Sequence, residues 1–309
     1  MLFRSDRAGL SNYFLILHDL IRFARGRGIR CQGRGSAANS LVAYLLDITP
    51  VDPLRHALLF ERFLSAERQT TPDVDIDFDA ERREEVIQYV YQRYGQAHAA
   101  MACTLVTYRA RSALRDVGKA LNLPPEVVAE AAKWLDTNDP QKLADSPDLK
   151  RALGSRWMTG RWTQLLDLCR QLDGAPRHLG IHNGGMVITG PPLSERLPTE
   201  PATMPGRVVV QWDKDALEDA GMVKIDILGL RMLSAISEAA AHAEALTGQP
   251  LNLDRLTFDD PAVYRMVSAA DTIGVFQVES RAQAQVLPRL RPRCFNDLIV
   301  AISLIRPGP

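Results

Sequence analysis

Residues 71–79 read TPDVDIDFD, in which acidic and apolar residues alternate. Alternation predicts a β-strand, because successive side chains of a strand point to opposite faces. One face would carry Asp73, Asp75, Asp77 and Asp79. Like charges side by side destabilise a strand, so this face is either solvent-exposed or neutralised by cations. The run of aspartates backed by apolar residues favours cations, with the carboxylates bridging two divalent ions about 4 Å apart.

Asp226 stands within the apolar stretch VKIDILGL, residues 223–230. A single charge in an apolar strand is costly unless it is paired. In one interpretation Lys224, two residues away on the same face, is its ion-pair partner. In the other, Asp226 lies on a strand beside the aspartate strand and completes a three-carboxylate metal site with Asp73 and Asp75. Lys224 would then point at substrate phosphate.

A glycine–serine loop, GRGSAANSLVAYLL at residues 33–46, contains a predicted helix over 37–46. Backbone amides at a helix N-terminus form an anion site when glycines allow close approach. Ser36 is alternatively explained as the N-cap of that helix. The loop lacks the GxxxxGK[ST] spacing of a Walker A motif, which argues against an ATPase of that type. A glycine–serine turn followed by a carboxylate strand matches a nucleotidyl-transfer site, which needs a triphosphate cradle beside two metals.

Helical and strand patterns alternate in blocks along the chain. Helical periodicity covers residues 10–28, 37–46, 81–95, 110–175 and the chain from Arg231 onward. Strand patterns cover residues 71–79, 185–188, 208–212 and 222–228. This order predicts a mixed α/β fold with an all-helical insert, a return to strands and a second helical region.

The composition, with 46% apolar and 24% charged residues, indicates an ordinary globular protein. Lysine plus arginine equals aspartate plus glutamate, at 37 each, so the net charge says nothing about partners. No apolar stretch is long enough to span a bilayer, and the N-terminus does not resemble a secretion signal. The four cysteines lie far apart, which predicts reduced thiols in a cytoplasmic protein. The abrupt end after an apolar run suggests a piece of a longer protein.

Two further groups of side chains have the spacing of a binding site. Arg111, Arg115 and Lys119 recur every four residues and form one basic stripe on a predicted helix. Such a stripe either holds DNA phosphates or is a solvated helix face. His178 and His182 have i, i+4 spacing, but no HExxH glutamate lies between them and glycines interrupt the segment. We expect a loop there and no zinc site.

Six motifs occur in the order typical of one known family: GRGSAANSLVAYLL, LLFERFLSAER, TPDVDIDFD, VKIDILGL, GVFQVESR and SLIRPGP. Together they resemble the catalytic alpha subunit of bacterial DNA polymerase III. The segments RHLGIHNGGMVI and VVVQWDKDALEDAGMVKIDILGL look most like its error-prone (ImuC-type) branch. The resemblance spans residues 12–309, essentially the whole chain.

The resemblance implies a polymerase-beta-type nucleotidyltransferase palm with an inserted helical thumb and the start of helical fingers. The implied boundaries are 1–104 for the first part of the palm, 105–182 for the thumb, 183–233 for the second part of the palm and 234–309 for the start of the fingers. On a thumb, the stripe of Arg111, Arg115 and Lys119 would contact DNA.

The resemblance also implies the roles of individual residues. Asp73 and Asp75 match metal-binding aspartates of the first palm motif and Asp226 matches the third, with Asp77 a secondary metal candidate. The implied nucleotide-binding residues are Arg34, Gly35, Ser36, Arg62 and Lys224. The implied cofactor is a pair of Mg²⁺ ions, for which Mn²⁺ would substitute. The implied substrates are primer–template DNA and dNTPs.

The implied activity is error-prone, DNA-directed DNA synthesis associated with DNA damage. A sliding clamp and mutasome accessory proteins are implied partners, through regions outside this chain, and no membrane partner is implied. Three alternatives stay open: a replicative alpha subunit, a non-catalytic DNA- or protein-binding fragment, and a nucleotidyltransferase acting on a substrate other than DNA. The carboxylates and the glycine–serine loop disfavour the binding fragment. The thumb insert and the fingers motif disfavour the third alternative.

Overall fold

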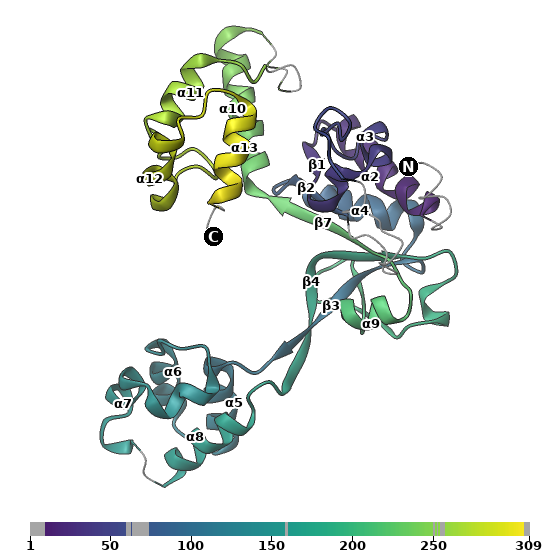
Figure 1. The fold of residues 1–309 in the computed structure, drawn as a ribbon. Coiled ribbons are helices and arrows are strands. Elements are labelled where there is room, and N and C mark those ends of the chain that lie inside the picture. The colour runs from purple at the N-terminus through teal and green to yellow at the C-terminus, as the bar shows by residue number, and fades with distance from the viewer. Residues whose placement is uncertain are drawn as a thin grey trace. The chain divides into compact units, whose positions relative to one another are not determined.

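A mixed seven-stranded sheet organises much of the computed structural model, which describes residues 10–59, 63, 74–157, 160–249, 251, 253 and 257–305 (Figure 1). The strands are β1 (Cys31–Gly33), β2 (Asp75–Asp79), β3 (Ala99–Thr107), β4 (Pro176–Ile188), β5 (Thr199–Pro201), β6 (Val208–Val210) and β7 (Lys224–Leu230). Their order across the sheet is β1-β2-β7-β4-β3-β6-β5. Residues distant in the sequence, those of β2 and β7, therefore lie on adjacent strands.

The largest apolar core lies where α2 (Ser11–Gly26) and α4 (Arg83–Tyr94) pack against one face of the sheet. Leu17 and Leu20 of α2 are fully buried in it. Burying a side chain of this size stabilises the fold by about 1.5–3 kcal/mol. A smaller core covers the other face of β3, β4 and β6 and includes Leu217 of α9 (Lys214–Asp219). The half of that face formed by β2 and β7 has no such apolar cover among the described residues.

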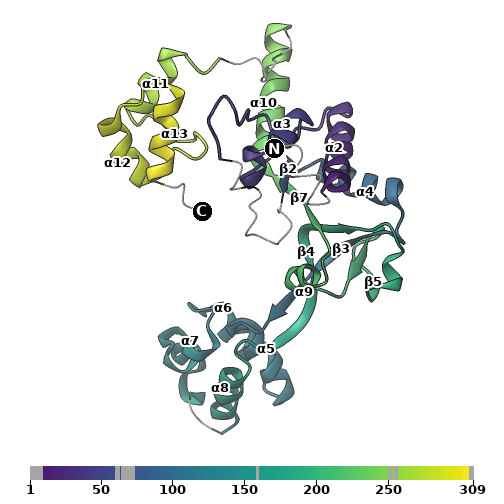
Figure 2. The ribbon, with the colours of Figure 1, turned by 45° about the vertical axis from the view of Figure 1, so that its right-hand side comes forward.

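A helical insert lies between β3 and β4, at the end of the long pair that these strands form (Figures 1 and 2). It contains α5 (Ala110–Ala120), α6 (Pro125–Lys133), α7 (Pro147–Leu153) and α8 (Arg161–Gln171), and it has its own apolar core. Gly118 of α5 faces Val128 of α6 so closely that a Cβ would come within 2.9 Å of a valine methyl. The missing side chain therefore permits close packing of the two helices.

The chain divides into two compact units, one of residues 1–78 and 82–229 and one of residues 79–81 and 230–309. The second unit contains α10 (Arg231–Thr247), α11 (Pro261–Ser268), α12 (Arg281–Leu290) and α13 (Phe295–Leu304). Its small core consists of Val267, Val278, Leu287 and Ala301. Among the described residues no helix is long and apolar enough to cross a membrane.

The predicted mixed α/β fold with an all-helical insert is confirmed. The four cysteines are free thiols, as expected. One local expectation is wrong, and the alternative explanation of Ser36 as a helix N-cap is not supported. His178 and His182 lie on β4 and not in a loop, because pairing with β3 outweighs the poor strand propensity of Gly180 between them and of the two glycines that follow His182. Ser40, not Ser36, is the N-cap of α3 (Leu41–Leu45), since its Oγ accepts the N–H of Ala43 at 3.2 Å.

Candidate functional site

Asp75, Asp77 and Asp226 lie on adjacent strands and on the same face of the sheet. The apolar residues that alternate with them all pack in the core with α2 and α4; these are Ile76, Phe78, Ile225 and Ile227. Because successive side chains of a strand point to opposite faces, the three aspartates point away from that core. Asp73 and Arg62, also predicted to belong to the site, lie outside the described residues.

The glycine–serine loop reaches this carboxylate face through Arg34. Its backbone N–H donates to the carbonyl of Asp75 at 3.0 Å, and its Nε lies 3.5 Å from a carboxylate oxygen of Asp75 and 3.6 Å from one of Asp77. Gly35 follows with φ +65°, a left-handed conformation that glycine adopts without strain. Ser36 comes next, in a short 3-10 helix (Gly35–Asn39). The loop therefore brings a cation, a left-handed turn and a hydroxyl-bearing residue to β2.

The aspartates of β2 differ in their surroundings. Asp75 is partly exposed, whereas Asp77 is buried. Burial raises the pKa of Asp77, and the guanidinium of Arg34 opposes this shift. Asp79, at the end of the strand, already accepts two hydrogen bonds: its Oδ1 accepts the hydroxyl of Ser234 at 2.6 Å and the backbone N–H of Glu81 at 3.1 Å. Asp75 is thus the most accessible carboxylate among them.

Asp226 is buried between Lys224 and His182. The ion pair with Lys224 suggested by the sequence is present, and Nζ donates to Oδ2. Oδ1 accepts no hydrogen bond from the described residues, and it lies 3.9 Å from Nδ1 of His182. A buried carboxylate oxygen without a donor is costly and requires an explanation. His182 was not predicted to be part of this site. The signal that the sequence offered was the pair of glycines after it, Gly184 and Gly185, which stand directly before the apolar residues 186–188 of the strand.

The carboxylate face supplies the ligand chemistry of a hard divalent cation, because Asp75, Asp77 and Asp226 offer only oxygen. The donor-free Oδ1 of Asp226 is the observation that fits such an ion best. Arg34 and Lys224 neutralise part of the negative charge in the structure. Within the described residues, which omit Asp73, no group of three or more His, Cys, Asp or Glu side chains is close enough to hold a metal ion.

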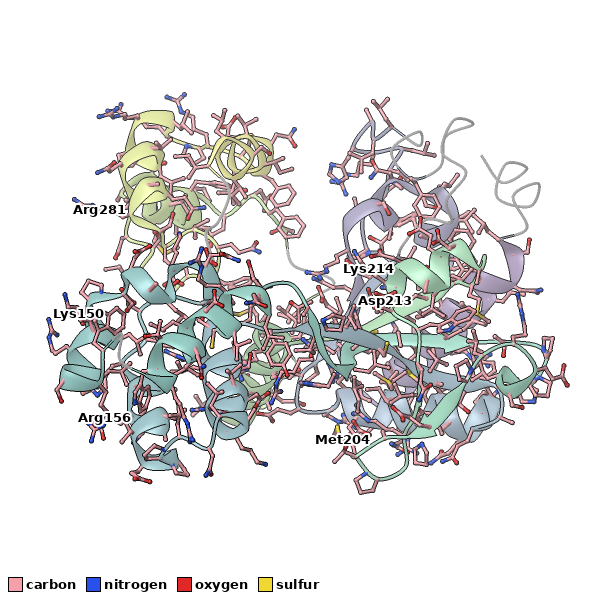
Figure 3. The ribbon with its side chains drawn as sticks, turned by 90° about the horizontal axis from the view of Figure 1, so that it is seen from below. Lys150, Arg156, Met204, Asp213, Lys214 and Arg281 are labelled. Atoms are coloured by element: carbon pink, nitrogen blue, oxygen red, sulfur yellow. The ribbon has the colours of Figure 1, made fainter. Side chains whose placement is uncertain are left out.

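The predicted DNA-binding stripe lies on the helical insert. All three residues of the stripe lie on α5 and are exposed: Arg111, Arg115 and Lys119. Arg111 is partly engaged, since its guanidinium donates to the carbonyl of Leu135 at 3.1 Å. Other basic side chains of the insert, Lys150 and Arg156 among them, also point outward (Figure 3). Arg115 and Lys119 are therefore the members of the stripe that are best placed to bind an anion.

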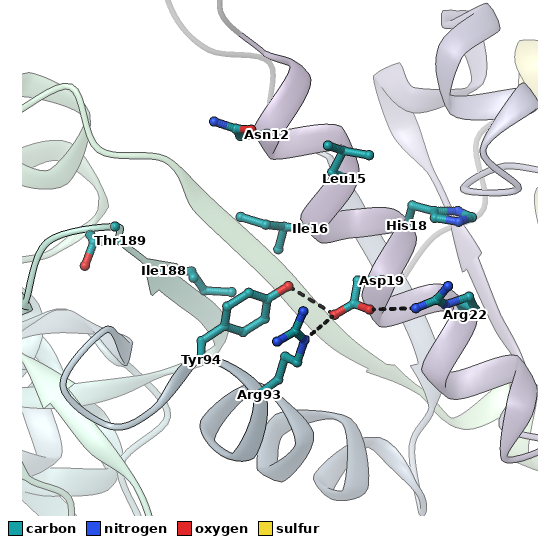
Figure 4. A pocket seen from close by; sticks show the side chains of 11 residues that line it. Asn12, Leu15, Ile16, His18, Asp19, Arg22, Arg93, Tyr94, Ile188 and Thr189 are labelled. Atoms are coloured by element: carbon teal, nitrogen blue, oxygen red, sulfur yellow. Dashed lines mark hydrogen bonds and ion pairs between the residues drawn. The ribbon is translucent and has the colours of Figure 1, made fainter.

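A pocket of about 620 Å³ opens elsewhere in the same unit, between α2, the end of α4 and the end of β4 (Figure 4). Its acidic group, Asp19, is already satisfied. It accepts the hydroxyls of Tyr89 and Tyr94 at 3.0 and 3.1 Å and pairs with Arg22 and Arg93. None of the aspartates of β2 or β7 lines this pocket. The carboxylate face, with its donor-free oxygen, is therefore the stronger candidate for the functional site.

Comparison with known proteins gives two family matches and several close relatives. Residues 6–229 match the family described as bacterial DNA polymerase III alpha NTPase domain, and residues 232–309 match its finger domain. The chain is 53% identical over 313 residues to an error-prone DNA polymerase of Anaeromyxobacter dehalogenans (strain 2CP-1), covering 98% of this chain and 27% of that protein. It is 52% identical to an error-prone DNA polymerase of Methylococcus capsulatus, covering 96% and 28%. The chain thus spans a little over a quarter of the length of these relatives.

Proposed function

Because the chain belongs to the bacterial DNA polymerase III alpha subunit family, we propose that it carries the active site of an error-prone, DNA-directed DNA polymerase. The reaction forms a bond between the 3′-oxygen of a DNA primer and the α-phosphorus of a dNTP, and releases pyrophosphate. The observation that carries the proposal is the position of Asp75 and Asp226 on adjacent strands, facing the same side of the sheet beside Arg34 and Lys224.

Two Mg²⁺ ions, replaceable by Mn²⁺, would be held by the carboxylates of Asp73, Asp75 and Asp226, with Asp77 as a secondary ligand. When bound, such ions make the hydroxyl more acidic and stabilise the charge of the leaving pyrophosphate. The donor-free Oδ1 of Asp226 supports this assignment. Asp75 supports it too, since its carboxylate is partly exposed.

Basic and backbone groups around the carboxylates would bind the triphosphate. Arg34 and Lys224 contact the carboxylates in the structure, and they would exchange these contacts for phosphate oxygens once metal ions neutralise the aspartates. Gly35 and Ser36 would approach the phosphates through backbone and hydroxyl donors. Arg62 would complete this set. These local cations would balance the negative charge of the triphosphate, although the net charge of the whole chain is zero.

The domain roles follow the family. Residues 1–104 and 183–233 would form a polymerase-beta-type palm, residues 105–182 a thumb and residues 234–309 the start of the fingers. The exposed stripe of Arg111, Arg115 and Lys119 supports a thumb that holds primer–template DNA. A sliding clamp and mutasome accessory proteins would bind parts of the whole enzyme that lie outside this chain. The whole enzyme would work in the bacterial cytoplasm.

The names of the relatives favour the error-prone branch over a replicative alpha subunit. A copying-fidelity assay on the full-length enzyme distinguishes the two. An error frequency that matches replicative alpha subunits would contradict the proposed branch, although the chemistry proposed for the carboxylates would stand.

The site is tested by titrating the chain with Mn²⁺, first alone and then with dNTP. Binding is measured as the loss of the electron paramagnetic resonance signal of the free ion. The variant Asp75→Asn/Asp226→Asn should bind Mn²⁺ at least about tenfold more weakly, because it removes two anionic ligands. A matched control, Asp173→Asn/Asp215→Asn, changes two aspartates away from the site and should bind as the parent does. Equal binding by both variants, with circular dichroism showing that they are folded, would refute the assignment.

A further inference from the structure

Strand β4 has a bulge at residues 182–185. The register between β3 and β4 shifts here: Met101 pairs with Met186, whereas Cys103 pairs with Ile181. Two positions along β3 therefore correspond to five along β4. The extra residues leave the hydrogen-bonded ladder to β3, and their backbone groups need other partners.

His182 supplies that partner from within the bulge. Its Nδ1 accepts the N–H of Gly185 at 2.7 Å and that of Gly184 at 3.2 Å. Both glycines are buried, and a buried N–H without an acceptor costs about 1–3 kcal/mol. Because the lone pair of Nδ1 is engaged, the neutral ring carries its proton on Nε2. Nδ1 therefore has no hydrogen to donate to Asp226, 3.9 Å away.

The bulge lies directly against Asp226. Gly185 is the register partner of Asp226 across β4 and β7. A Cβ on Gly185 would meet Nδ1 of His182 and Cδ of Lys224, each at 2.9 Å, and Oδ1 of Asp226 at 3.1 Å. The backbone of the bulge thus forms the wall beside Oδ1 of Asp226, the one buried carboxylate oxygen that lacks a donor among the described residues. Any movement of this wall would change the space around Oδ1.

We propose that His182 is a positioning residue of the carboxylate site. By accepting the two glycine N–H groups it holds the bulge against β7, and the bulge in turn fixes Asp226 with Oδ1 open. His182 neither binds the metal nor transfers a proton in this role. The inference rests on the proposed function only in assigning Oδ1 to a metal ion; the acceptor role of Nδ1 is independent of it.

Isosteric substitutions separate the two ring nitrogens. His182→Asn places an amide oxygen near the position of Nδ1 and keeps the acceptor. His182→Gln places its amide near Nε2, and His182→Ala removes both. Amide exchange of Gly184 and Gly185, followed by nuclear magnetic resonance, reports on the bulge. We expect both amides to stay protected in the wild type and in His182→Asn, and to exchange at least about tenfold faster in the Gln and Ala variants.

The same four proteins are then titrated with Mn²⁺. We expect His182→Asn to bind within about threefold of the wild type, and the Gln and Ala variants to bind about tenfold or more weakly, as for other residues that orient a ligand. Should the Ala variant fail to fold, the Asn and Gln pair decides.

Three outcomes would overturn the proposal. The acceptor role is wrong if the two amides exchange as fast in His182→Asn as in His182→Gln. The link to the site is wrong if protection is lost and Mn²⁺ affinity is unchanged. A role for Nε2 is indicated instead if Gln preserves Mn²⁺ affinity and Asn does not. If the wild type itself binds no Mn²⁺, the proposed function fails, and the exchange data alone still decide whether His182 holds the bulge.

Discussion

Lys224 and Asp226 stand two residues apart on β7, and Nζ of Lys224 donates to Oδ2 of Asp226. Their side chains are only 13% and 9% exposed. Taking two charges out of water is expensive, and their attraction compensates only while both partners are present. The ion pair therefore keeps the carboxylate of Asp226 charged in the interior without leaving it isolated.

Removing the lysine alone should destabilise the chain. We expect Lys224→Met, measured by urea denaturation in buffer with EDTA, to lose about 3 kcal/mol of unfolding free energy, because it leaves a buried carboxylate without its cation. The double variant Lys224→Met/Asp226→Leu, which removes both charges, should recover most of this loss. A double variant as unstable as the single one would show that packing, and not the unpaired charge, causes the effect.

Asp77 gives the chain a pH dependence that can be measured without metal. Burial raises its pKa above the usual 3.8, with Arg34 opposing the shift. The folded state therefore binds a proton more tightly than the unfolded state, and stability falls as the pH rises from about 4 through the folded pKa. In EDTA, Asp77→Asn should lack this contribution, so its stability relative to the wild type should improve as the pH rises above about 4. The matched control is Asp173→Asn, which changes an exposed aspartate away from the site.

Much of the site could be predicted from local pattern. Alternation in residues 74–79 and 223–230 indicates two strands whose aspartates point to one side, and the structure has both strands. What pattern could not supply is pairing between distant segments. β4 contains glycines that disfavour a strand, and it forms because β3 and β7 pair with it.

For the same reason, the role of His182 could not be predicted from local sequence pattern. Its Nδ1 meets two glycine N–H groups only because β4 bulges, and the bulge exists only in relation to β3. The short strands β1 and β5 have three residues each, too few for a periodicity to appear. Ser40, and not Ser36, caps α3 because a short 3-10 helix (Gly35–Asn39) lies between Arg34 and the start of α3. No residue propensity specifies this 3-10 helix.

The basic stripe on α5 can be distinguished from a solvated helix face by its salt dependence. Each phosphate contact contributes about 0.9 to the slope of log K against log salt concentration for duplex DNA. We expect Arg115→Ala/Lys119→Ala to reduce that slope by about 2 in a fluorescence anisotropy titration with primer–template DNA. The control Lys142→Ala/Arg151→Ala removes two exposed cations on other elements of the insert. Equal slopes for the two variants would identify the stripe as a solvated face.

Gly184 tests whether β4 and β7 must approach closely for the site to form. A Cβ at this position would lie 2.5 Å from the carbonyl oxygen of Ile227, and a backbone atom within a sheet cannot move aside as a side chain can. We expect Gly184→Ala to lose about 2–3 kcal/mol in urea denaturation, as for other overpacked positions, and to weaken Mn²⁺ binding because Asp226 lies on the displaced strand. Gly190 is the matched control: a Cβ there would have no atom within 4 Å, so Gly190→Ala should change stability by no more than about 0.5 kcal/mol. A Gly184→Ala chain as stable as Gly190→Ala would mean that the two strands separate without penalty, and that close contact with the bulge is not what fixes Asp226.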